Sequence, residues 1–524
     1  MEAVAPAGRP ADRPAARALG EGRALVFVGF MGAGKSSAAR AAAAQIGGRP
    51  LDSDAELQRA LGEPIETFFD REGEAEFRRR EEAVVLELLA RPDARVVALG
   101  GGAPGSERVR EALAGHVVVH LEVHPEAAWR RASGRGRPLA RDRDRFHALH
   151  AERRGLYESV ADATLPAGDP GTAVSTLPAL LALAEAPSGT RLVWATASSG
   201  QYPVFVGHGL LAADFFHPRD ARRFAVSDAN VVRLHRVEAD WSFELPPGER
   251  EKTPARAEEV LRAMARAGVT RDDLVAAVGG GVVGDLGGFC AAVYQRGIRH
   301  VQVPTTLVAQ VDSAYGGKTG VDLPEGKNYV GAYHQPSAVL VDVGTLETLP
   351  EAERAAGYAE VVKTALIAGG ELWERVGRGD EPDAALVLGC LRTKLAIVAE
   401  DERDAGRRQV LNLGHTVGHA LEAATGYERL RHGEAVGLGL LCALRLSGRD
   451  ALRTEVEELL RAGGLPVRAE GIDLADVLAL VEHDKKRRAG GVPFVLVEAP
   501  GRVTPGHSVA EADLRAAVEE VCSA

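Results

Sequence analysis

Lysine is scarce in this 524-residue chain, which has only 8 lysines among its 63 basic residues. Arginine therefore supplies nearly all of the surface positive charge. An ammonium group on a flexible stem can meet a single phosphate or hydroxyl oxygen where a planar guanidinium does not fit. We expect the lysines to mark places where anions bind: Lys35, Lys252, Lys318, Lys327, Lys363, Lys394, Lys485 and Lys486.

Cysteines and long apolar segments are also scarce. The 4 cysteines are widely spaced and form no Cys-x-x-Cys pair, which is typical of a reducing compartment. No run of ~18 apolar residues occurs, so no transmembrane helix is predicted. Residues 1–22 are rich in Ala, Pro and Arg without an apolar core, so we expect a disordered tail rather than a signal peptide. The prediction is a cytoplasmic protein without a membrane partner.

The charge balance excludes another class of partner. A net charge of -11 and a pI near 5.8 argue against nucleic acid as the main ligand. Hydrophobic residues make up 45% of the chain, which is enough for several cores. Composition shifts predict a tail at 1–22, domains at 23–185, 191–343 and 344–524, and a linker at 186–190.

A phosphate-binding loop follows the first predicted strand. Residues 29–36 fit the pattern G-x-x-x-x-G-K-S between a buried strand and an Ala-rich helix. Amides at the start of such a helix bind phosphates, the lysine adds a positive charge, and the serine hydroxyl ligates Mg²⁺. We predict an ATP–Mg²⁺ site that includes Gly32, Ala33, Gly34, Lys35, Ser36 and Ser37.

Two carboxylates end the next predicted strand. In the segment LDSD, Asp52 and Asp54 lie on the same side of the strand end. One carboxylate can hold Mg²⁺ through water, and the other can orient and deprotonate an acceptor hydroxyl. Asp52 is the candidate for the metal and Asp54 the candidate base.

Four further motifs follow in order: GEAEFRRREE (73–82), LGGGA (99–103), RGRPLA (135–140) and ERRGLY (152–157). With the phosphate loop, this series resembles the shikimate kinase family, although Gly155 replaces the proline usual there. The resemblance implies that Arg137 is the lid arginine that stabilises the transferring phosphoryl group, with the neighbouring Arg135 and Arg141 as alternatives for this role. It also implies that shikimate contacts Asp54, Arg78, Gly100, Gly101, Gly102 and Arg153.

The second half has a Gly-rich segment, GGGVVGDLGGF, that begins at residue 279. Such glycines let a backbone approach a pyrophosphate at the start of a helix. A second Gly-rich segment follows and contains Asp312, Lys318, Lys327 and Asn328. Its two lysines and its asparagine can bind a polyhydroxylated anion. The pattern predicts a dinucleotide site beside an anion site.

Glu360, His415 and His432 are candidate metal ligands in this half. Three protein ligands with an open fourth position define a catalytic zinc site. His415 and His419 are four residues apart on one helix face, so both of these could also be ligands.

Together these segments resemble the 3-dehydroquinate synthase family over most of residues 195–500. The resemblance implies that Glu360, His415 and His432 hold Zn²⁺ or Co²⁺. It implies NAD contacts by Asp228, Asn230, Glu249, Lys252, Gly280, Gly281, Val282, Val283, Gly284, Asp285, Thr305, Thr306, Asp312, Lys318 and Lys327. It places in the substrate pocket Arg296, Asp312, Lys318, Lys327, Asn328, Lys363, Lys394, Arg408, Asn412, His419 and one of Lys485 and Lys486.

The resemblance also implies a reaction and an assembly. DAHP, a seven-carbon keto-acid phosphate, would be oxidised at C5 by NAD⁺, lose phosphate, be reduced again and close its ring by an aldol step. His419 and Asn412 would handle protons and contact the phosphate. The expected fold is α/β: a P-loop kinase domain with a parallel sheet, a Rossmann-like NAD domain and a mainly helical metal domain. A homodimer through the synthase half is expected.

Two alternatives remain open from the sequence. In the first, the second half has another chemistry: metal-dependent polyol dehydrogenases share its architecture but would accumulate NADH, and related sugar-phosphate cyclases make other rings. The kinase-like half could instead only bind nucleotide, although Lys35, Asp54 and an arginine in the lid segment are all present.

Overall fold

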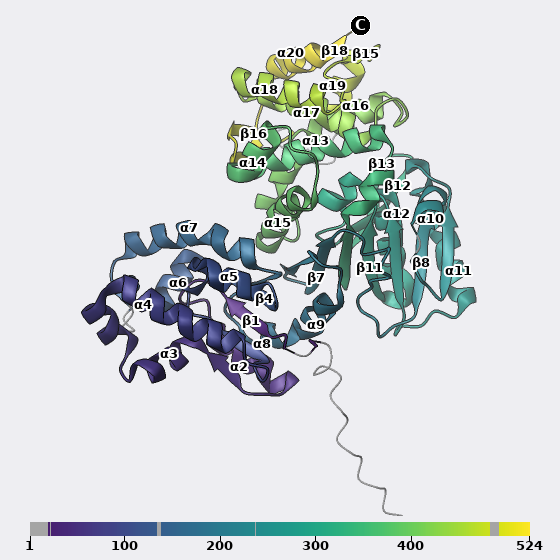
Figure 1. The fold of residues 1–524 in the computed structure, drawn as a ribbon. Coiled ribbons are helices and arrows are strands. Elements are labelled where there is room, and N and C mark those ends of the chain that lie inside the picture. The colour runs from purple at the N-terminus through teal and green to yellow at the C-terminus, as the bar shows by residue number, and fades with distance from the viewer. Residues whose placement is uncertain (1–18, 21, 134–137, 236, 483–491, 524) are drawn as a thin grey trace, which may run out of the picture. The chain divides into compact units, whose positions relative to one another are not determined.

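The computed structural model describes residues 19–20, 22–133, 138–235, 237–482 and 492–523. The chain forms two compact units, which divide after Trp194 (Figure 1). Unit 1 holds the phosphate loop, and unit 2 holds the second Gly-rich region and all three candidate metal ligands. Three residues predicted to act at the sites lie outside the described part of the chain: Arg137, Lys485 and Lys486.

Unit 1 contains a parallel sheet in the order β2-β3-β1-β4-β5-β6. The strands are short apolar runs, as expected where helices cover both faces of a parallel sheet. Their bounds are β1 (Leu25–Val28), β2 (Pro50–Asp52), β3 (Val96–Ala98), β4 (Val117–Glu122), β5 (Ala163–Pro166) and β6 (Arg191–Ala197), and the chain passes into unit 2 within β6.

Helices of unit 1 cover the two faces of this sheet. On one face, Val26, Val97 and Val118 form a core with apolar residues of α4 and α5. Leu25 and Phe27 point the opposite way and are fully buried as well, and α2 packs against β1, β2 and β3. The helices are α2 (Lys35–Ile46), α3 (Ser53–Leu61), α4 (Ile65–Leu89), α5 (Glu107–Leu113), α6 (Pro125–Ala132), α7 (Arg143–Val160), α8 (Pro170–Ser175) and α9 (Leu177–Glu185), with 3₁₀ turns η1 (Ala103–Gly105) and η2 (Pro138–Ala140).

Unit 2 opens with a second parallel sheet in the order β7-β14-β11-β10-β8-β9. Its strands are β7 (Gly200–Gly207), β8 (Arg223–Asp228), β9 (Trp241–Leu245), β10 (Leu274–Gly279), β11 (Arg299–Pro304) and β14 (Ala338–Asp342). Helices α10 (Ala229–Leu234), α11 (Pro254–Ala267) and α12 (Gly281–Val293) connect them. α12 begins two residues after β10 ends, so the Gly-rich segment forms the turn at the carboxyl edge of the sheet.

Between the sheet and the helical part lie a π-helix, η5 (Ala309–Ser313), and a hairpin formed by β12 (Lys318–Leu323) and β13 (Gly326–Tyr333). The 3₁₀ turns of this region are η3 (Glu249–Glu251), η4 (Tyr294–Arg296) and η6 (Val343–Thr348). These connections carry Asp312, Lys318, Lys327 and Asn328 of the predicted anion site.

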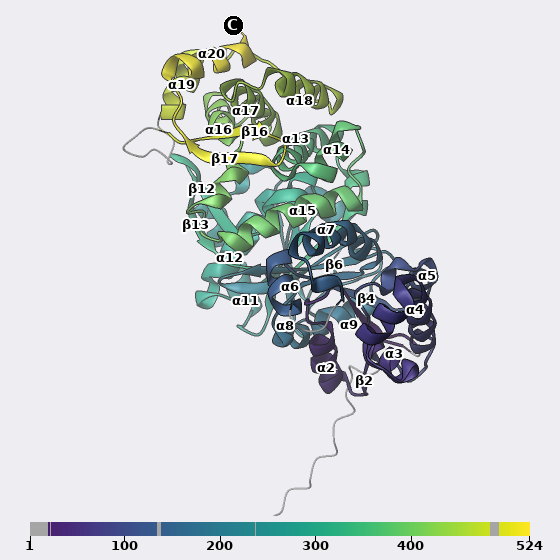
Figure 2. The same cartoon turned by 90° about the vertical axis from the view of Figure 1, so that its left-hand side faces the viewer.

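The rest of unit 2 is mainly helical (Figure 2). Almost every residue of α17 between Gly433 and Leu444 is buried, and α16, α13, α18 and α20 pack around it. The elements are α13 (Glu351–Ala368), α14 (Gly370–Gly377), α15 (Ala384–Glu400), η7 (Arg407–Asn412), α16 (His415–Ala424), α17 (His432–Leu446), α18 (Asp450–Ala462), α19 (Leu474–Glu482) and α20 (Glu511–Val521), with short strands β15 (Ala469–Glu470), β16 (Phe494–Ala499), β17 (Arg502–His507) and β18 (Cys522–Ser523).

The architecture confirms the predicted fold class, with a P-loop sheet, a Rossmann-like sheet and a helical part. Among the described residues, no helix combines the length and apolar character that a bilayer crossing requires.

Candidate active sites

The phosphate loop of unit 1 joins β1 to α2. Gly34 precedes the helix with a φ of 90°, and no side chain caps the helix, so its first amides face a cavity of about 790 Å³. The Lys35 ammonium donates to the carbonyl oxygens of Gly29 at 2.8 Å and Phe30 at 3.2 Å. A Cβ on Gly32 would come within 2.6 Å of the Ala128 carbonyl oxygen, so only glycine fits there. The loop can therefore cradle a phosphate chain.

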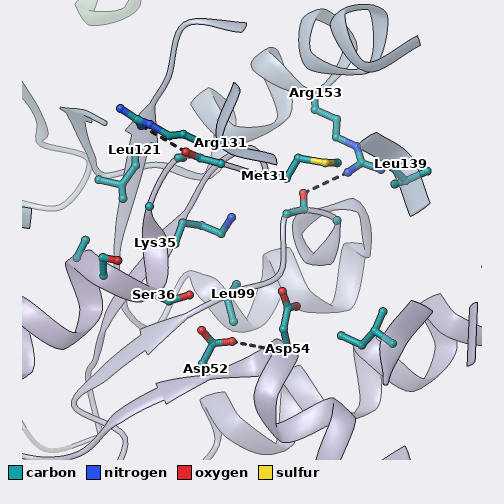
Figure 3. A pocket seen from close by; sticks show the side chains of 18 of the residues that line it. Met31, Lys35, Ser36, Asp52, Asp54, Leu99, Leu121, Arg131, Leu139 and Arg153 are labelled. Carbon is teal, nitrogen blue, oxygen red and sulfur yellow. Dashed lines mark hydrogen bonds between the residues drawn. The ribbon is translucent and has the colours of Figure 1, made fainter. Parts of the chain in front are cut away.

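Asp52, the last residue of β2, and Asp54, which follows the strand, line the same cavity (Figure 3). Asp52 caps α3, because its Oδ1 accepts hydrogen bonds from the amides of Asp54 at 3.0 Å and Ala55 at 3.3 Å. Asp54 lies in the first turn of that helix. The cap fixes the position of both carboxylates opposite Lys35 and Ser36.

The glycines of the LGGGA segment let side chains approach the backbone closely. A Cβ on Gly100 would lie 2.6 Å from Oδ1 of Asp54, and a Cβ on Gly102 would lie 1.9 Å from Nη1 of Arg78. Arg153 donates to the Gly101 carbonyl oxygen at 3.5 Å (Figure 3). These glycines therefore bring a carboxylate and two guanidinium groups to one wall of the cavity.

A carboxylate that the sequence analysis did not single out holds Arg78 in place. Oε2 of Glu81 accepts a hydrogen bond of 2.6 Å from Nη1 of Arg78, and Glu81 is only 4% exposed. Burial raises the pKa of Glu81, while the Arg78 guanidinium opposes that rise. The i, i+3 spacing of these residues in RRREE was the only sequence signal of this contact.

Most of the residues predicted for the first site line this cavity. Gly100 and Arg137 are not among the lining residues; Gly100 lies behind the wall, and Arg137 is outside the described residues. The cavity also includes residues that the sequence analysis missed: Glu81, Arg131, Leu139, Asp169 and Thr172.

Unit 2 has a cavity of about 1210 Å³ between its sheet and its helical part. On the sheet side, α12 begins at Gly281 without a side-chain cap, and a Cβ on Gly280 would come within 2.9 Å of Thr306. This turn therefore leaves backbone amides available to a pyrophosphate. Predicted residues that line the sheet side are Asp228, Asn230, Glu249, Lys252, Gly280, Gly281, Val282, Val283, Asp285, Thr305, Thr306, Asp312, Lys318, Lys327 and Asn328.

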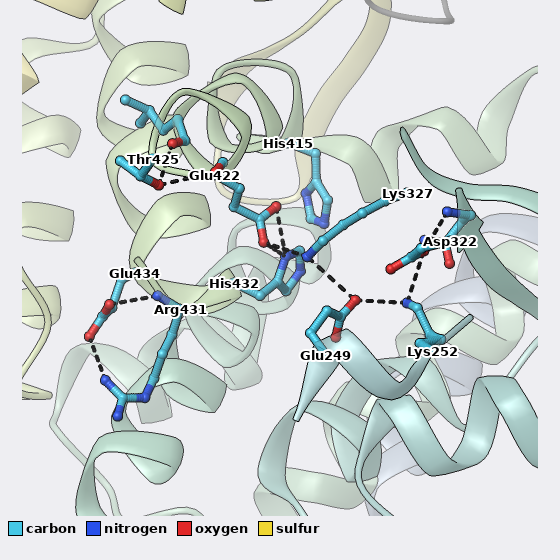
Figure 4. Close-up of polar contacts among 12 residues, drawn as sticks. Glu249, Lys252, Asp322, Lys327, His415, Glu422, Thr425, Arg431, His432 and Glu434 are labelled. Carbon is cyan, nitrogen blue, oxygen red and sulfur yellow. Dashed lines mark hydrogen bonds and ion pairs between the residues drawn. The ribbon is translucent and has the colours of Figure 1, made fainter. Parts of the chain in front are cut away.

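The buried Lys252 contacts three carboxylates on the sheet side of this cavity, which we call the nucleotide floor (Figure 4). Nζ of Lys252 lies 2.9 Å from Glu249, 3.3 Å from Asp285 and 3.7 Å from Asp322. Burial would lower the pKa of Lys252, but the three carboxylates outweigh burial and raise it. Lys252 therefore stays charged and keeps these carboxylates together.

Glu360, His415 and His432 meet in the helical part, although they come from α13, α16 and α17. Oε1 of Glu360 lies 3.5 Å from Nε2 of His415 and 3.3 Å from Nε2 of His432. Glu360 is fully buried, and its Oε1 accepts no hydrogen bond of normal geometry. The donor set of two imidazoles and one carboxylate fits a divalent transition metal.

A second group of possible ligands overlaps the first and consists of His419, Glu422 and His432. The orientation of the imidazoles favours the first group. The Leu413 carbonyl oxygen lies 3.1 Å from Nδ1 of His415, which leaves Nε2 directed at Glu360. Nδ1 of His432 faces Glu422, which also leaves its Nε2 directed at Glu360.

Asp312 links the metal-ligand cluster to the anion-binding residues. Its Oδ2 lies 3.0 Å from Nζ of Lys363, and Lys394 contacts both its carboxylate and its carbonyl oxygen. Burial would raise the pKa of Asp312, but the two ammonium groups hold it well below its usual range. Lys394, Arg408, Asn412, His415, His419 and His432 line the helical side of the cavity.

Each lysine in the described part of the chain lies at one of the two sites. Lys35 is in the phosphate loop, and Lys252, Lys318, Lys327 and Lys394 line the cavity of unit 2. Lys363 and Glu360 lie just behind its wall, in contact with lining residues. Gly284 and Arg296 do not line this cavity, and Arg296 is exposed on η4.

Two carboxylates at this second site had no sequence signal. Glu422 lies between Lys327 and His432, and Asp404 ion-pairs with Lys318 at 2.6 Å. Their partners are distant in the chain, so no local pattern pointed to them.

Family comparisons identify both units. Residues 31–176 match the shikimate kinase model. Residues 242–356 and 357–487 match the models of the N-terminal and C-terminal parts of 3-dehydroquinate synthase.

Whole-protein comparisons agree for unit 2. A 3-dehydroquinate synthase of Halorhodospira halophila is 42% identical over 355 residues, which cover 63% of this chain and 100% of that protein. One of Symbiobacterium thermophilum is 43% identical over 333 residues and covers 58% of this chain and 93% of its own length. The solved structure of 2-epi-5-epi-valiolone synthase from Streptomyces hygroscopicus, with NAD⁺ and Zn²⁺ bound, is 29% identical with a TM-score of 0.56 and covers 62% of this chain and 97% of its own.

The relatives match over nearly their whole length, and the kinase model matches a separate part of the chain. The chain therefore belongs to the 3-dehydroquinate synthase family, carries a shikimate kinase domain before that part, and is a bifunctional enzyme of the shikimate pathway.

Proposed function

We propose that the residues that line the cavity of unit 1 transfer the γ-phosphoryl group of ATP–Mg²⁺ to shikimate. Lys35 and the amides at the start of α2 would hold the phosphates, and Ser36 and Asp52 would hold Mg²⁺, directly and through water. Asp54 would accept the proton of the shikimate hydroxyl. The two guanidinium groups of Arg78 and Arg153 suit the planar carboxylate of shikimate. Arg137 is proposed as the lid arginine.

We propose that the cavity of unit 2 converts DAHP to 3-dehydroquinate. The turn at Gly280–Asp285, with Asp228, Glu249 and Lys252, would bind NAD. Glu360, His415 and His432 would hold Zn²⁺ or Co²⁺. When bound, NAD would accept and return a hydride, and the cation would polarise the hydroxyl that is oxidised.

The protein's own residues would bind and orient DAHP. Lys318, Lys394 and Arg408 supply positive charge for its carboxylate and phosphate, and Asn412 and His419 stand beside them in the cavity. Burial of Lys394 lowers its pKa, although Asp312 opposes this shift. Asp312 already holds Lys394, and Asp404 already holds Lys318, so these cations need little reorganisation when an anion enters.

One observation carries this proposal: three metal-ligand candidates from three helices converge at one wall of a cavity whose opposite wall is a Gly-rich helix start. The test is phosphate release from DAHP by the full chain. We expect release to need NAD⁺ at catalytic amounts, to stop after chelation and to return with Zn²⁺ or Co²⁺ but not with Mg²⁺. Stoichiometric NADH from simple polyols, without phosphate release from DAHP, would contradict the proposal.

The kinase can be tested on the same preparation. After chelation, Mg²⁺ alone should restore ATP-dependent phosphorylation of shikimate, because unit 1 offers hydroxyl and carboxylate oxygens that suit this cation. Nucleotide binding without phosphorylation would instead identify a binding module. We further propose a cytoplasmic homodimer that forms through the synthase part, with domain boundaries at 23–185, 191–343 and 344–524.

A further inference from the structure

Glu422 is a buried carboxylate between two groups of the synthase site (Figure 4). It lies on α16, one helical turn after His419, and is only 2% exposed. The proposed chemistry assigns it no contact with substrate, NAD or metal. A charge at this depth is costly unless it is paired, so its partners indicate its role.

The first partner is the His432 imidazole. Nδ1 of His432 lies 3.4 Å from Oε1 and 3.5 Å from Oε2 of Glu422. An ionised carboxylate can only accept a hydrogen bond, so this contact requires a proton on Nδ1. In the neutral ring, Nε2 then carries the lone pair, and this is the atom that lies 3.3 Å from Glu360.

The second partner is Lys327, which comes from the hairpin on the sheet side of the cavity. Its Nζ donates to Oε1 of Glu422 at 3.0 Å and lies 3.4 Å from Glu249. Glu249 in turn pairs with Lys252 at 2.9 Å. A chain of alternating charges therefore runs from the proposed nucleotide floor to the imidazole of a proposed metal ligand.

We propose that Glu422 is a positioning residue that fixes the tautomer and orientation of His432 for the metal and, through Lys327, couples the metal-binding wall to the nucleotide-binding wall. This inference rests on the proposed assignment of Glu360, His415 and His432 as the metal site. Carboxylates behind a ligating histidine orient the ring and raise its basicity. Glu422 does more than orient His432, because its Oε1 also accepts a hydrogen bond from Lys327 on the sheet side of the cavity.

The geometry separates this role from direct ligation. Both oxygens of Glu422 face Nδ1 of His432, and one of them also accepts from Lys327. Glu360 Oε1, in contrast, faces two imidazole Nε2 atoms. A metal at Glu360 would therefore leave the contacts of Glu422 intact.

The test measures metal and NAD affinity of the full chain, without turnover. Zn²⁺ affinity is obtained by competition with a chromogenic chelator, and the visible spectrum of the Co²⁺-loaded protein reports ligand geometry. The variants are Glu422→Ala, Glu422→Gln, Lys327→Met and Glu360→Ala. The control is Glu520→Gln, which removes a carboxylate paired with Arg445 and Arg453 in the same helical part.

We expect Glu422→Ala to weaken Zn²⁺ binding by about 10–100-fold and to change the Co²⁺ spectrum. Glu422→Gln should weaken it less, since an amide oxygen still accepts from Nδ1. Lys327→Met and the control should keep the wild-type Zn²⁺ affinity. The loss of NAD affinity caused by Glu422→Ala should shrink on the Lys327→Met background, because both changes cut the same chain of contacts.

The outcomes separate the two levels of the proposal. A wild-type chain that binds neither Zn²⁺ nor Co²⁺ would overturn the proposed metal site itself. If the Glu422→Ala and Glu422→Gln variants fold and bind Zn²⁺ as tightly as the wild type, only the proposed role of Glu422 is overturned. Zn²⁺ binding that survives Glu360→Ala but not Glu422→Ala would make Glu422 a ligand and would also overturn this role.

Discussion

Lys363 on α13 and Asp312 on η5 form an ion pair at the edge of the synthase cavity, with Nζ 3.0 Å from Oδ2. Lys363 is 1% exposed and also ion-pairs with Glu360, the fully buried candidate metal ligand. The pair therefore connects the metal-binding wall to the residues that hold Lys394 and the anion pocket.

We expect Lys363→Met to destabilise unit 2 more than any exposed lysine change would. The substitution leaves the fully buried Glu360 without its cation and Asp312 with Lys394 alone, which costs about 3–5 kcal/mol in the free energy of unfolding. Urea unfolding of the full chain measures this loss. Lys318→Met is the matched control, since its side chain is 49% exposed and exposed pairs contribute about 1 kcal/mol or less. Equal destabilisation by the two changes would contradict the prediction.

Gly102→Ala should impair the kinase through Arg78. The new Cβ would overlap Nη1 of Arg78, so the guanidinium must leave its place beside Glu81. A misplacement of about 1 Å at a binding group can cost 10²-fold in rate. We expect a rise in the KM for shikimate, an unchanged KM for ATP and unchanged synthase activity. Gly105→Ala, where a Cβ meets nothing within 4 Å, is the control; a similar loss there would show that the effect is not due to Arg78.

Asp54→Asn should remove most of the kinase activity without weakening ATP binding. An amide cannot take the hydroxyl proton, and a positioned base contributes about 10²–10⁴-fold to the rate. Steady-state kinetics should show the loss in kcat, and synthase activity of the same polypeptide serves as the internal control. A loss confined to the KM for shikimate would assign Asp54 to binding alone.

Unit 2 should lose stability in acid because of Glu402. Burial would raise the pKa of Glu402, but hydrogen bonds from Ser198, Ser199 and Gln335 lower it to about 2. The charged form is therefore favoured by folding. The contribution of Glu402 to the free energy of unfolding is complete above the pKa of the unfolded state, about 4.3, and disappears as the pH falls toward 2. Its upper bound is about 3 kcal/mol.

Glu402→Gln should reduce that acid sensitivity while lowering stability at neutral pH. Unfolding midpoints of unit 2 at pH 6, 5, 4 and 3 (roughly unit steps across the titration) measure the effect. Glu498→Gln replaces an exposed carboxylate, 62% exposed, and should keep the wild-type profile. An unchanged profile for Glu402→Gln would refute the assignment.

The motifs that could be predicted from the sequence are those whose residues are close together in the chain. The phosphate loop and the turn at Gly280 each need only a strand, a few glycines and a helix start, so their pattern predicts their geometry. The scarcity of lysine was equally informative, because each described lysine lies at a site. Arg296 shows the limit of this inference: the family resemblance implies a place in the substrate pocket, yet Arg296 is exposed and does not line the cavity.

Tertiary structure alone decided which distant side chains meet. Glu360 reaches His415 and His432 because α13, α16 and α17 pack together, and no spacing in the chain encodes that packing. Glu422 reaches Lys327 for the same reason, across 95 residues. The sequence determined the two chemistries through short local motifs, whereas the buried carboxylates that orient them depend on how helices and sheets pack.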